Sequence, residues 1–323
     1  MKKSMRLVAL VLTILLALGL MAGASAESDK KVRVALILEG AISDMSWNAT
    51  AYNGLMKIEA LGAEVKYIEN TPASSVADAI RTFGDEGYNV IFLATSSFAD
   101  AGAATAKEYP DTQFFFINSK VVDTNCASFV IQDAEQGFLM GAISALLTQS
   151  KTVGFIGGLE IQPIKNGAQG FAQGVAYVDP SIKVLSQNTG SMDDVNAAKE
   201  LAKSFIGQGA DVLSPMANQA SLGVMEAAQE SGACKAIGSG LNQETVAPDA
   251  AVTAVVKDTS IAYEAAYKAY LAGELPSEPI KMGAAQGVVY VGDFYNTVSD
   301  DVKTKIADIY QKLAAGEITI TLQ

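Results

Sequence analysis

The sequence predicts an α/β protein with two doubly wound parallel-sheet lobes that are joined by a multi-strand hinge. Short apolar runs rich in β-branched residues alternate with helical patterns. The same series of elements then recurs after about 120 residues. A last group of elements remains after the second series, and its return to both lobes would make several crossovers. Ligands of open parallel sheets bind beyond the carboxyl ends of the strands, so two facing lobes would share one cleft.

The first series begins with a continuous apolar run at 32–38 (VRVALIL), which is typical of a buried parallel strand. A polar loop follows it and leads into a helix. Further strands and helices then alternate up to residue 118. The expected strands are 32–38, 65–68, 90–94 and 114–118, and the expected helices are 47–61, 77–86 and 101–108.

The second series repeats the first. Strands are expected at 152–157 and 184–186, and helices at 168–178 and 197–207. Gly54 and Gly174 occupy the same place in the first helix of each series. The segments 209–214 and 233–238 match 87–92 and 114–118 at nearly the same offset. Loose self-matches arise in any α/β chain, but several landmarks at one offset favour an internal repeat.

The remaining chain supplies a strand at 251–256, a helix at 261–271, a strand at 287–291 and an exposed helix at 300–313 that is rich in Asp and Lys. We assign residues 30–131 and 257–282 to an N-terminal lobe. We assign residues 132–256 and 283–323 to a C-terminal lobe.

The N-terminus has the layout of a secretory signal peptide. A basic start precedes an apolar run at 7–20, and Ala24-Ser25-Ala26 supplies small residues for cleavage after Ala26. A membrane anchor is the alternative, but the run is short for a span of about 20 residues. No Cys lies near the cleavage point, so we do not expect a lipid anchor. The protein is expected to be exported, to the periplasm or the extracellular space.

Composition excludes several function classes. The formal net charge is −12 at pH 7, which disfavours nucleic-acid binding. The absence of His excludes Ser-His-Asp and Cys-His catalysis, and neither a metal nor a cofactor is expected. An enzyme using paired carboxylates among Asp44, Glu135 and Glu160 stays a less favoured alternative. Cys126 and Cys234 could pair in an oxidising compartment, but two buried free thiols are favoured.

The loop after the first strand carries a motif. Asp44-x-Ser46-Trp47-Asn48, followed by Tyr52 and Gly54, resembles the D-x-S-F-N-x-x-x-(aromatic)-x-G signature of the basic membrane protein family. Those proteins are substrate-binding proteins of ABC transporters, several of them purine-nucleoside receptors. Further similar segments follow in the family's order, at 106–114, 135–141, 154–174, 209–212 and 308–320.

The resemblance implies a type I periplasmic binding protein fold that is not an enzyme. It implies a purine nucleoside, nucleobase or related small heterocycle, held by an aromatic sandwich and captured by hinge closure. An ABC permease would be the partner of a monomeric receptor. A sensing subunit that engages a receptor ectodomain is the alternative function.

The resemblance also implies the ligand-binding residues. They follow several strands, and they are Asp44, Trp47, Asn48, Tyr52, Ser96, Ser97, Phe98, Asn118, Met216, Asn218, Ser239, Gly240 and Lys257. Asn118 stands where the family usually has a base-recognising Asp, and Gly240 stands where it has a ribose-binding Asp. Since glycine cannot accept bonds from a ribose diol, we expect a ligand that has drifted from ordinary nucleosides.

The residues of the first loop also allow simpler roles. Ser46 is the expected N-cap of the helix that begins near Trp47. Asp44 would be stabilised there by the helix dipole. Trp47 and Tyr52 could stack on a planar ligand or pack against the core, and the sequence leaves both open.

Overall fold

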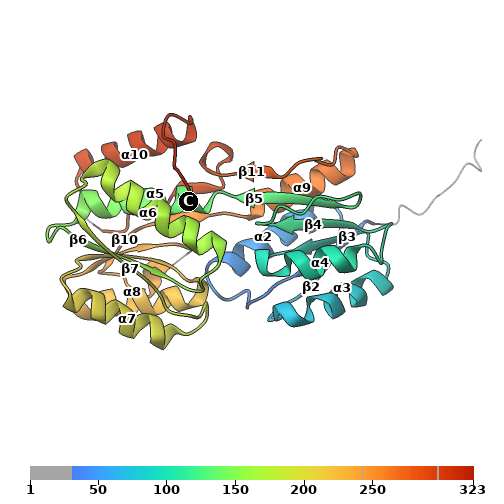
Figure 1. The fold of residues 1–323 in the computed structure, drawn as a ribbon, viewed down its shortest axis with the longest axis horizontal. Coiled ribbons are helices and arrows are strands. Elements are labelled where there is room, and N and C mark those ends of the chain that lie inside the picture. Colours follow the sequence, from blue (N-terminus) through green and yellow to red (C-terminus); the bar gives the residue numbers. More distant parts are fainter. Residues whose placement is uncertain (1–30, 242, 297) are drawn as a thin grey trace, which may run out of the picture. The chain divides into compact units, whose positions relative to one another are not determined.

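The computed structural model describes residues 31–241, 243–296 and 298–323 (Figure 1). The expected signal peptide, residues 1–26, lies outside the described residues. Residues from Arg33 onward form one compact unit. Within the described part of the chain, no helix has the length and apolarity needed to cross a membrane.

The first sheet has six parallel strands in the order β11-β5-β4-β3-β1-β2. Helices α3 and α4 pack together over one face of it, and α2 and α9 over the other. The strands are β1 (Arg33–Ile37), β2 (Glu64–Ile68), β3 (Val90–Leu93), β4 (Gln113–Ile117), β5 (Cys126–Ile131) and β11 (Ile280–Met282). The helices are α2 (Trp47–Ala60), α3 (Val76–Asp85), α4 (Ala99–Ala106) and α9 (Ser260–Ala272).

The second sheet has the order β12-β10-β9-β8-β6-β7, which repeats that of the first sheet strand for strand. Only the edge differs, because β12 is antiparallel to β10 whereas β11 is parallel to β5. The strands are β6 (Thr152–Gly157), β7 (Lys183–Asn188), β8 (Val212–Met216), β9 (Lys235–Gly238), β10 (Ala251–Lys257) and β12 (Val289–Val291). The helices are α5 (Asp133–Leu147), α6 (Gln162–Val178), α7 (Val195–Gly207), α8 (Ser221–Ser231) and α10 (Asp300–Ala314).

The two glycines predicted to be equivalent have the same structural role. A side chain at Gly54 would collide with Tyr263 of α9, and one at Gly174 would collide with the backbone of Phe138 in α5. Each glycine therefore allows the helix that contains it, α2 or α6, to approach a neighbouring helix closely. This agreement, together with the shared strand order, confirms the fold class and the internal repeat.

The chain passes between the sheets three times. It leaves the first sheet after β5, returns through the segment that follows β10, and leaves again between β11 and β12. The buried side chains of Thr50 in α2 and Thr259, just before α9, hydrogen-bond each other at 2.8 Å beside the second of these connections.

Two expectations needed correction. The sequence predicts no strand at β5 and no helix at α5. Helix α5 escapes prediction because it is buried on nearly every side and lacks amphipathic periodicity. The helix predicted at 300–313 is exposed on one side only, since Ile306, Ile309 and Leu313 of α10 are buried.

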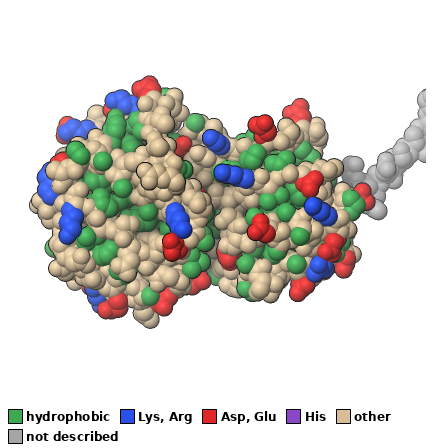
Figure 2. Space-filling view, viewed as in Figure 1, with side chains coloured by type: hydrophobic (Ala, Val, Ile, Leu, Met, Phe, Trp, Pro, Cys, Tyr) green, Lys and Arg blue, Asp and Glu red, His purple; other side chains and the backbone are tan. Residues whose placement is uncertain are grey.

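Both cysteines are free and buried, as favoured. Cys126 belongs to the first sheet and Cys234 precedes β9 of the second. Burial raises the pKa of Cys126 to about 11 and that of Cys234 to about 12, so neither thiol is reactive at neutral pH. On the face shown in Figure 2, acidic and basic side chains intermingle and form no patch of one sign.

Candidate functional site

A cavity of about 220 Å³ lies at the carboxyl ends of strands from both sheets. Loops after β1, β3 and β4 line it on one side, and loops after β6, β7 and β8 on the other. Lys257, the last residue of β10, also lines it. This is the position that open parallel sheets favour for ligands. We call the residues contributed by the first sheet's loops and α2 the first wall, and those contributed by the second sheet's loops and α6 the second wall.

Asp44 supports the first wall from behind the start of α2 and does not line the cavity. Its buried carboxylate accepts hydrogen bonds from the backbone N–H groups of Ser46, Asn48 and Ala49 and from the side chain of Asn48. Ser46 occupies the N-cap position of α2 but makes no side-chain cap bond, so the capping role predicted for Ser46 belongs to Asp44. Asp44 thereby fixes the start of α2, where Trp47 and Asn48 face the cavity.

Trp47 is held by its indole nitrogen. Nε1 donates to the carbonyl oxygen of Ala94 at 2.6 Å, at the end of β3. Lys257 Nζ lies 5.1 Å from the centre of the ring, within cation–π range. The ring is therefore fixed in place as a rigid apolar surface, suited to stacking on a flat ligand.

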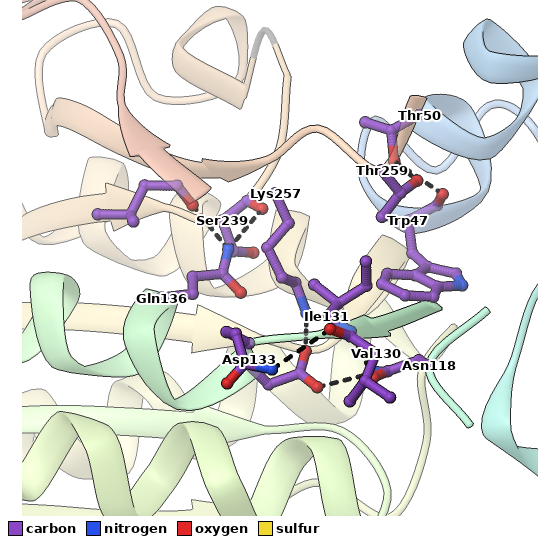
Figure 3. A network of polar contacts seen from close by, with 12 residues as sticks. Trp47, Thr50, Asn118, Val130, Ile131, Asp133, Gln136, Ser239, Lys257 and Thr259 are labelled. Atoms are coloured by element: carbon purple, nitrogen blue, oxygen red, sulfur yellow. Dashed lines mark hydrogen bonds and ion pairs between the residues drawn. The ribbon is translucent and has the colours of Figure 1, made fainter. Parts of the chain in front are cut away.

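Asp133, at the start of α5, holds two cavity residues (Figure 3). Its buried carboxylate accepts from Lys257 Nζ at 2.6 Å and from Asn118 Nδ2 at 2.8 Å. Asn118 has a φ of 61° and also accepts, through Oδ1, from the backbone N–H of Ile131. Both ends of the Asn118 amide are therefore used by the protein, and the charge of Lys257 is balanced by that of Asp133.

Glu39 lies two residues after β1 and belongs to the first wall. Thr95 Oγ1 donates to its carboxylate at 3.1 Å. Burial raises the pKa of Glu39, and the negative charge of Asp193 raises it further, while hydrogen bonds from Thr95 and Ser97 oppose the shift. No ion pair of Glu39 is found within the described residues.

The second wall is mainly aliphatic. Leu159, Ile161, Pro163, Ile164 and Met192 line it, with Ser191, Asp193 and Asn218 as its polar members. Trp47 is the single aromatic side chain among the described residues around the cavity, so the aromatic sandwich implied by the resemblance is replaced by one indole facing aliphatic and thioether groups.

The predicted site residues separate into three groups. Trp47, Asn48, Ser96, Asn118, Asn218 and Lys257 line the cavity. Met216 and Ser239 line a smaller adjoining cavity that shares Trp47, Asn218 and Lys257 with the first. Asp44, Tyr52, Ser97, Phe98 and Gly240 line neither.

The residues outside the cavities have other contacts. Tyr52 packs edge-on against Tyr67 at 5.1 Å between ring centres, and Phe98 is fully buried in the core of the first sheet. Ser97 lies beside Glu39. A Cβ atom at Gly240 would collide with the carbonyl oxygen of Met45, which accepts a hydrogen bond from Leu241 N at 2.7 Å.

Sequence reasoning missed Glu39, Asp133, Met192 and Asp193. Glu39 had a usable signal, because it is an acidic residue directly after a buried strand, where ligands of parallel sheets bind. Asp193 and Met192 lie in a loop after β7 with no distinctive pattern, and Asp133 belongs to a helix that was not predicted.

A family model described as "ABC transporter substrate-binding protein PnrA-like" matches residues 31–323. The chain belongs to this family. Its members are substrate-binding proteins and not enzymes. The three carboxylates considered for catalysis have other surroundings: Asp44 caps α2, Glu135 accepts from the backbone N–H of Ala284, and Glu160 lies on the surface near Lys165.

Relatives and solved structures agree with this assignment. A "Purine-binding protein" of Brucella abortus is 27% identical and matches 93% of this chain and 86% of its own length. "Transcriptional activator protein med" of Bacillus subtilis is also 27% identical, over 94% of this chain and 95% of its own. An ABC transporter solute-binding protein of Aeropyrum pernix has the same fold, with a TM-score of 0.80 at 20% identity over 90% of this chain and 94% of its own.

Proposed function

We propose that this protein is the extracytoplasmic receptor of an ABC transporter that captures a purine nucleoside, a nucleobase or a related flat heterocycle. The observation that carries the proposal is the fixed indole of Trp47, which lines a cavity of about 220 Å³ opposite aliphatic side chains. A planar ring can stack there with its apolar faces covered. The name of the Brucella relative points to the same ligand class.

The polar contacts of this ligand differ from those implied by the resemblance. Asn118 uses one N–H and one oxygen lone pair of its amide to position Asp133 and Ile131, so only the second of each remains for a ligand. Gly240 carries no side chain, and a Cβ atom at this position would collide with the carbonyl oxygen of Met45. Glu39, Ser96, Asp193 and Asn218 are among the polar groups that line the cavity and can reach a ligand.

Hinge closure is the proposed capture mechanism. The lobes would be residues 30–131 with 257–282 and residues 132–256 with 283–323, joined by the three connections between the sheets. Contacts such as Met45 with Leu241 form when the walls are together. A ligand that touches both walls therefore favours the closed state, and a permease distinguishes it from the open one.

Calorimetric titration with adenosine, guanosine, inosine and the corresponding free bases tests the ligand class. We expect at least one of these compounds to bind, with a free base at least as tight as its ribonucleoside. A ribonucleoside that binds far more tightly than its base would show that a ribose site persists. Absence of binding by every purine would refute the ligand class.

Export is part of the proposal. Cleavage of a signal peptide after Ala26 would release a monomer without a lipid anchor, and intact-mass measurement of the secreted protein tests this. A sensing role is the second candidate, favoured by the relative named as a transcriptional activator. Co-purification with permease subunits would support transport, and co-purification with a receptor ectodomain would support sensing.

A further inference from the structure

The charged groups around the cavity do not balance. Three charged side chains line it, namely Glu39, Asp193 and Lys257. Glu39 belongs to the first wall and Asp193 to the second, so each wall contributes one carboxylate. The two lie close enough for the charge of Asp193 to raise the pKa of Glu39.

Lys257 does not neutralise these carboxylates. Its ammonium is 2.6 Å from Asp133 Oδ1, and Asp133 is buried. Turning Lys257 toward Glu39 would leave the Asp133 carboxylate buried without a counter-charge, which is strongly unfavourable. Among the described residues that line the cavity there is no Arg and no other Lys. Two negative charges therefore face the cavity without a protein cation.

An unpartnered acceptor in the adjoining cavity points the same way. Gln136 is fully buried, and its Nε2 donates to the carbonyl oxygens of Ser239 and Val255, which fixes the orientation of the amide (Figure 3). Its Oε1 is buried and has no hydrogen-bond partner within the described residues. A buried acceptor left without a donor is costly, so a hydrogen-bond donor is favoured over a further acceptor beside it.

We infer that the ligand is an organic cation, a flat heterocycle with a protonated or quaternised nitrogen that lies between Glu39 and Asp193. The inference rests on the proposed function and specifies the charge of its ligand. The cation joins two walls whose carboxylates repel each other, so it promotes closure through charge as well as contact. Its face stacks on Trp47, and its N–H groups meet acceptors that the protein leaves free.

Two pairs of compounds test the charge preference by calorimetry. 1-Methyladenosine is cationic at neutral pH, and its isomer N6-methyladenosine is neutral. Tryptamine is cationic, and tryptophol is its neutral counterpart. We expect the cation of at least one pair to bind about ten- to a hundredfold more tightly than its partner, because each hydrogen bond to a charged group contributes that much.

Variants connect the preference to the two carboxylates. The double variant Glu39→Gln with Asp193→Asn should lose most of the preference. Glu278→Gln removes one negative charge from an exposed residue outside the cavity and should keep the preference. Three results would each overturn the inference. The neutral partner could bind equally or more tightly in both pairs, none of the four compounds could bind, or the preference could survive in the double variant.

The same titrations separate the inference from the proposed function. If neutral adenosine binds and neither pair shows a preference for the cation, the purine receptor stands and the inference fails. If tryptamine is preferred over tryptophol while no purine binds, the purine class fails and the cation preference stands.

Discussion

The two walls of the cavity differ in how far their polar side chains already hydrogen-bond within the protein. In the first wall, Trp47, Asn48 and Asn118 all donate hydrogen bonds to other groups of the protein. Glu39 accepts one from Thr95. In the second wall the aliphatic side chains need no partners, and Asp193 is exposed. The first wall is thus a pre-formed surface, whereas the second supplies shape and one free charge. We therefore propose that a ligand is first positioned on the first wall and then covered by the second.

The largest expected effect comes from breaking the ion pair that supports the first wall. Asp133→Ala leaves the ammonium of Lys257 without its buried partner. We expect the free energy of unfolding to fall by about 3–5 kcal/mol, measured by urea denaturation. Asp133→Ala combined with Lys257→Met should recover much of the loss, because no unpaired charge remains. A double variant as unstable as the single one would show that charge is not the cause.

The second-largest expected effect is a loss of ligand affinity when the stacking surface of Trp47 is removed. Trp47→Ala is expected to reduce the affinity for a flat ligand by about 1–3 kcal/mol, measured by calorimetry. Tyr52→Ala is the matched control, since Tyr52 packs on Tyr67 and lines neither cavity. If both variants lose affinity equally, the assignment of the ligand to the Trp47 face is incorrect.

Closure of the walls can be opposed at a single glycine. A methyl group at Gly240 would collide with the carbonyl oxygen of Met45, so Gly240→Ala should disfavour the closed arrangement. We expect ligand affinity to fall by about 1 kcal/mol or more, with the unfolding free energy of the ligand-free protein unchanged. Gly207→Ala, at the end of α7 where a methyl group has open space, should leave affinity unaltered. Unchanged affinity in Gly240→Ala would contradict closure at this contact.

The smallest effect concerns pH. Burial and Asp193 raise the pKa of Glu39, while its other charged neighbour at the cavity, Lys257, is paired with Asp133. The folded state therefore binds the Glu39 proton more tightly than the unfolded state does. Its stabilising contribution is complete below the ordinary Glu pKa and is lost as the pH rises through the raised value.

Comparison of the wild type with Glu39→Gln isolates this effect. The unfolding free energy of the wild type relative to the variant should fall as the pH rises from the ordinary Glu pKa through the raised one. Urea denaturation over a pH window that starts near the ordinary Glu pKa measures it. A difference that rises across this window would mean that the pKa of Glu39 is lowered in the folded state.

The repeat made the fold predictable from the sequence, and packing made parts of it unpredictable. Apolar strands such as β1 and β6, and the paired glycines 54 and 174, could be identified from pattern alone. Helix α5 could not, because Gly137 and Gly141 let it pack directly on the backbone of α6, and its remaining surface is buried as well. A helix without a polar face has no amphipathic signal.

The site was predictable at the level of loops and less so at the level of side chains. Trp47 and Lys257 line the cavity, since they lie at strand or helix ends that face it. Tyr52 lies in the same helix as Trp47, and Phe98 follows Ser96 in the same short segment, but both side chains point elsewhere. The direction of a side chain depends on packing that a motif does not record. Asp133 acts on the cavity through Asn118 and Lys257, and such indirect roles need the folded geometry.

The most direct test of the central claim is mass spectrometry of the small molecules released when the protein, purified without added ligand, is denatured. We expect a flat heterocyclic compound in about equal molar amount to the protein, retained by Tyr52→Ala and lost from Trp47→Ala. A compound that is not a planar heterocycle, or one retained equally by Trp47→Ala, would contradict capture of a flat ligand against Trp47 of the first wall.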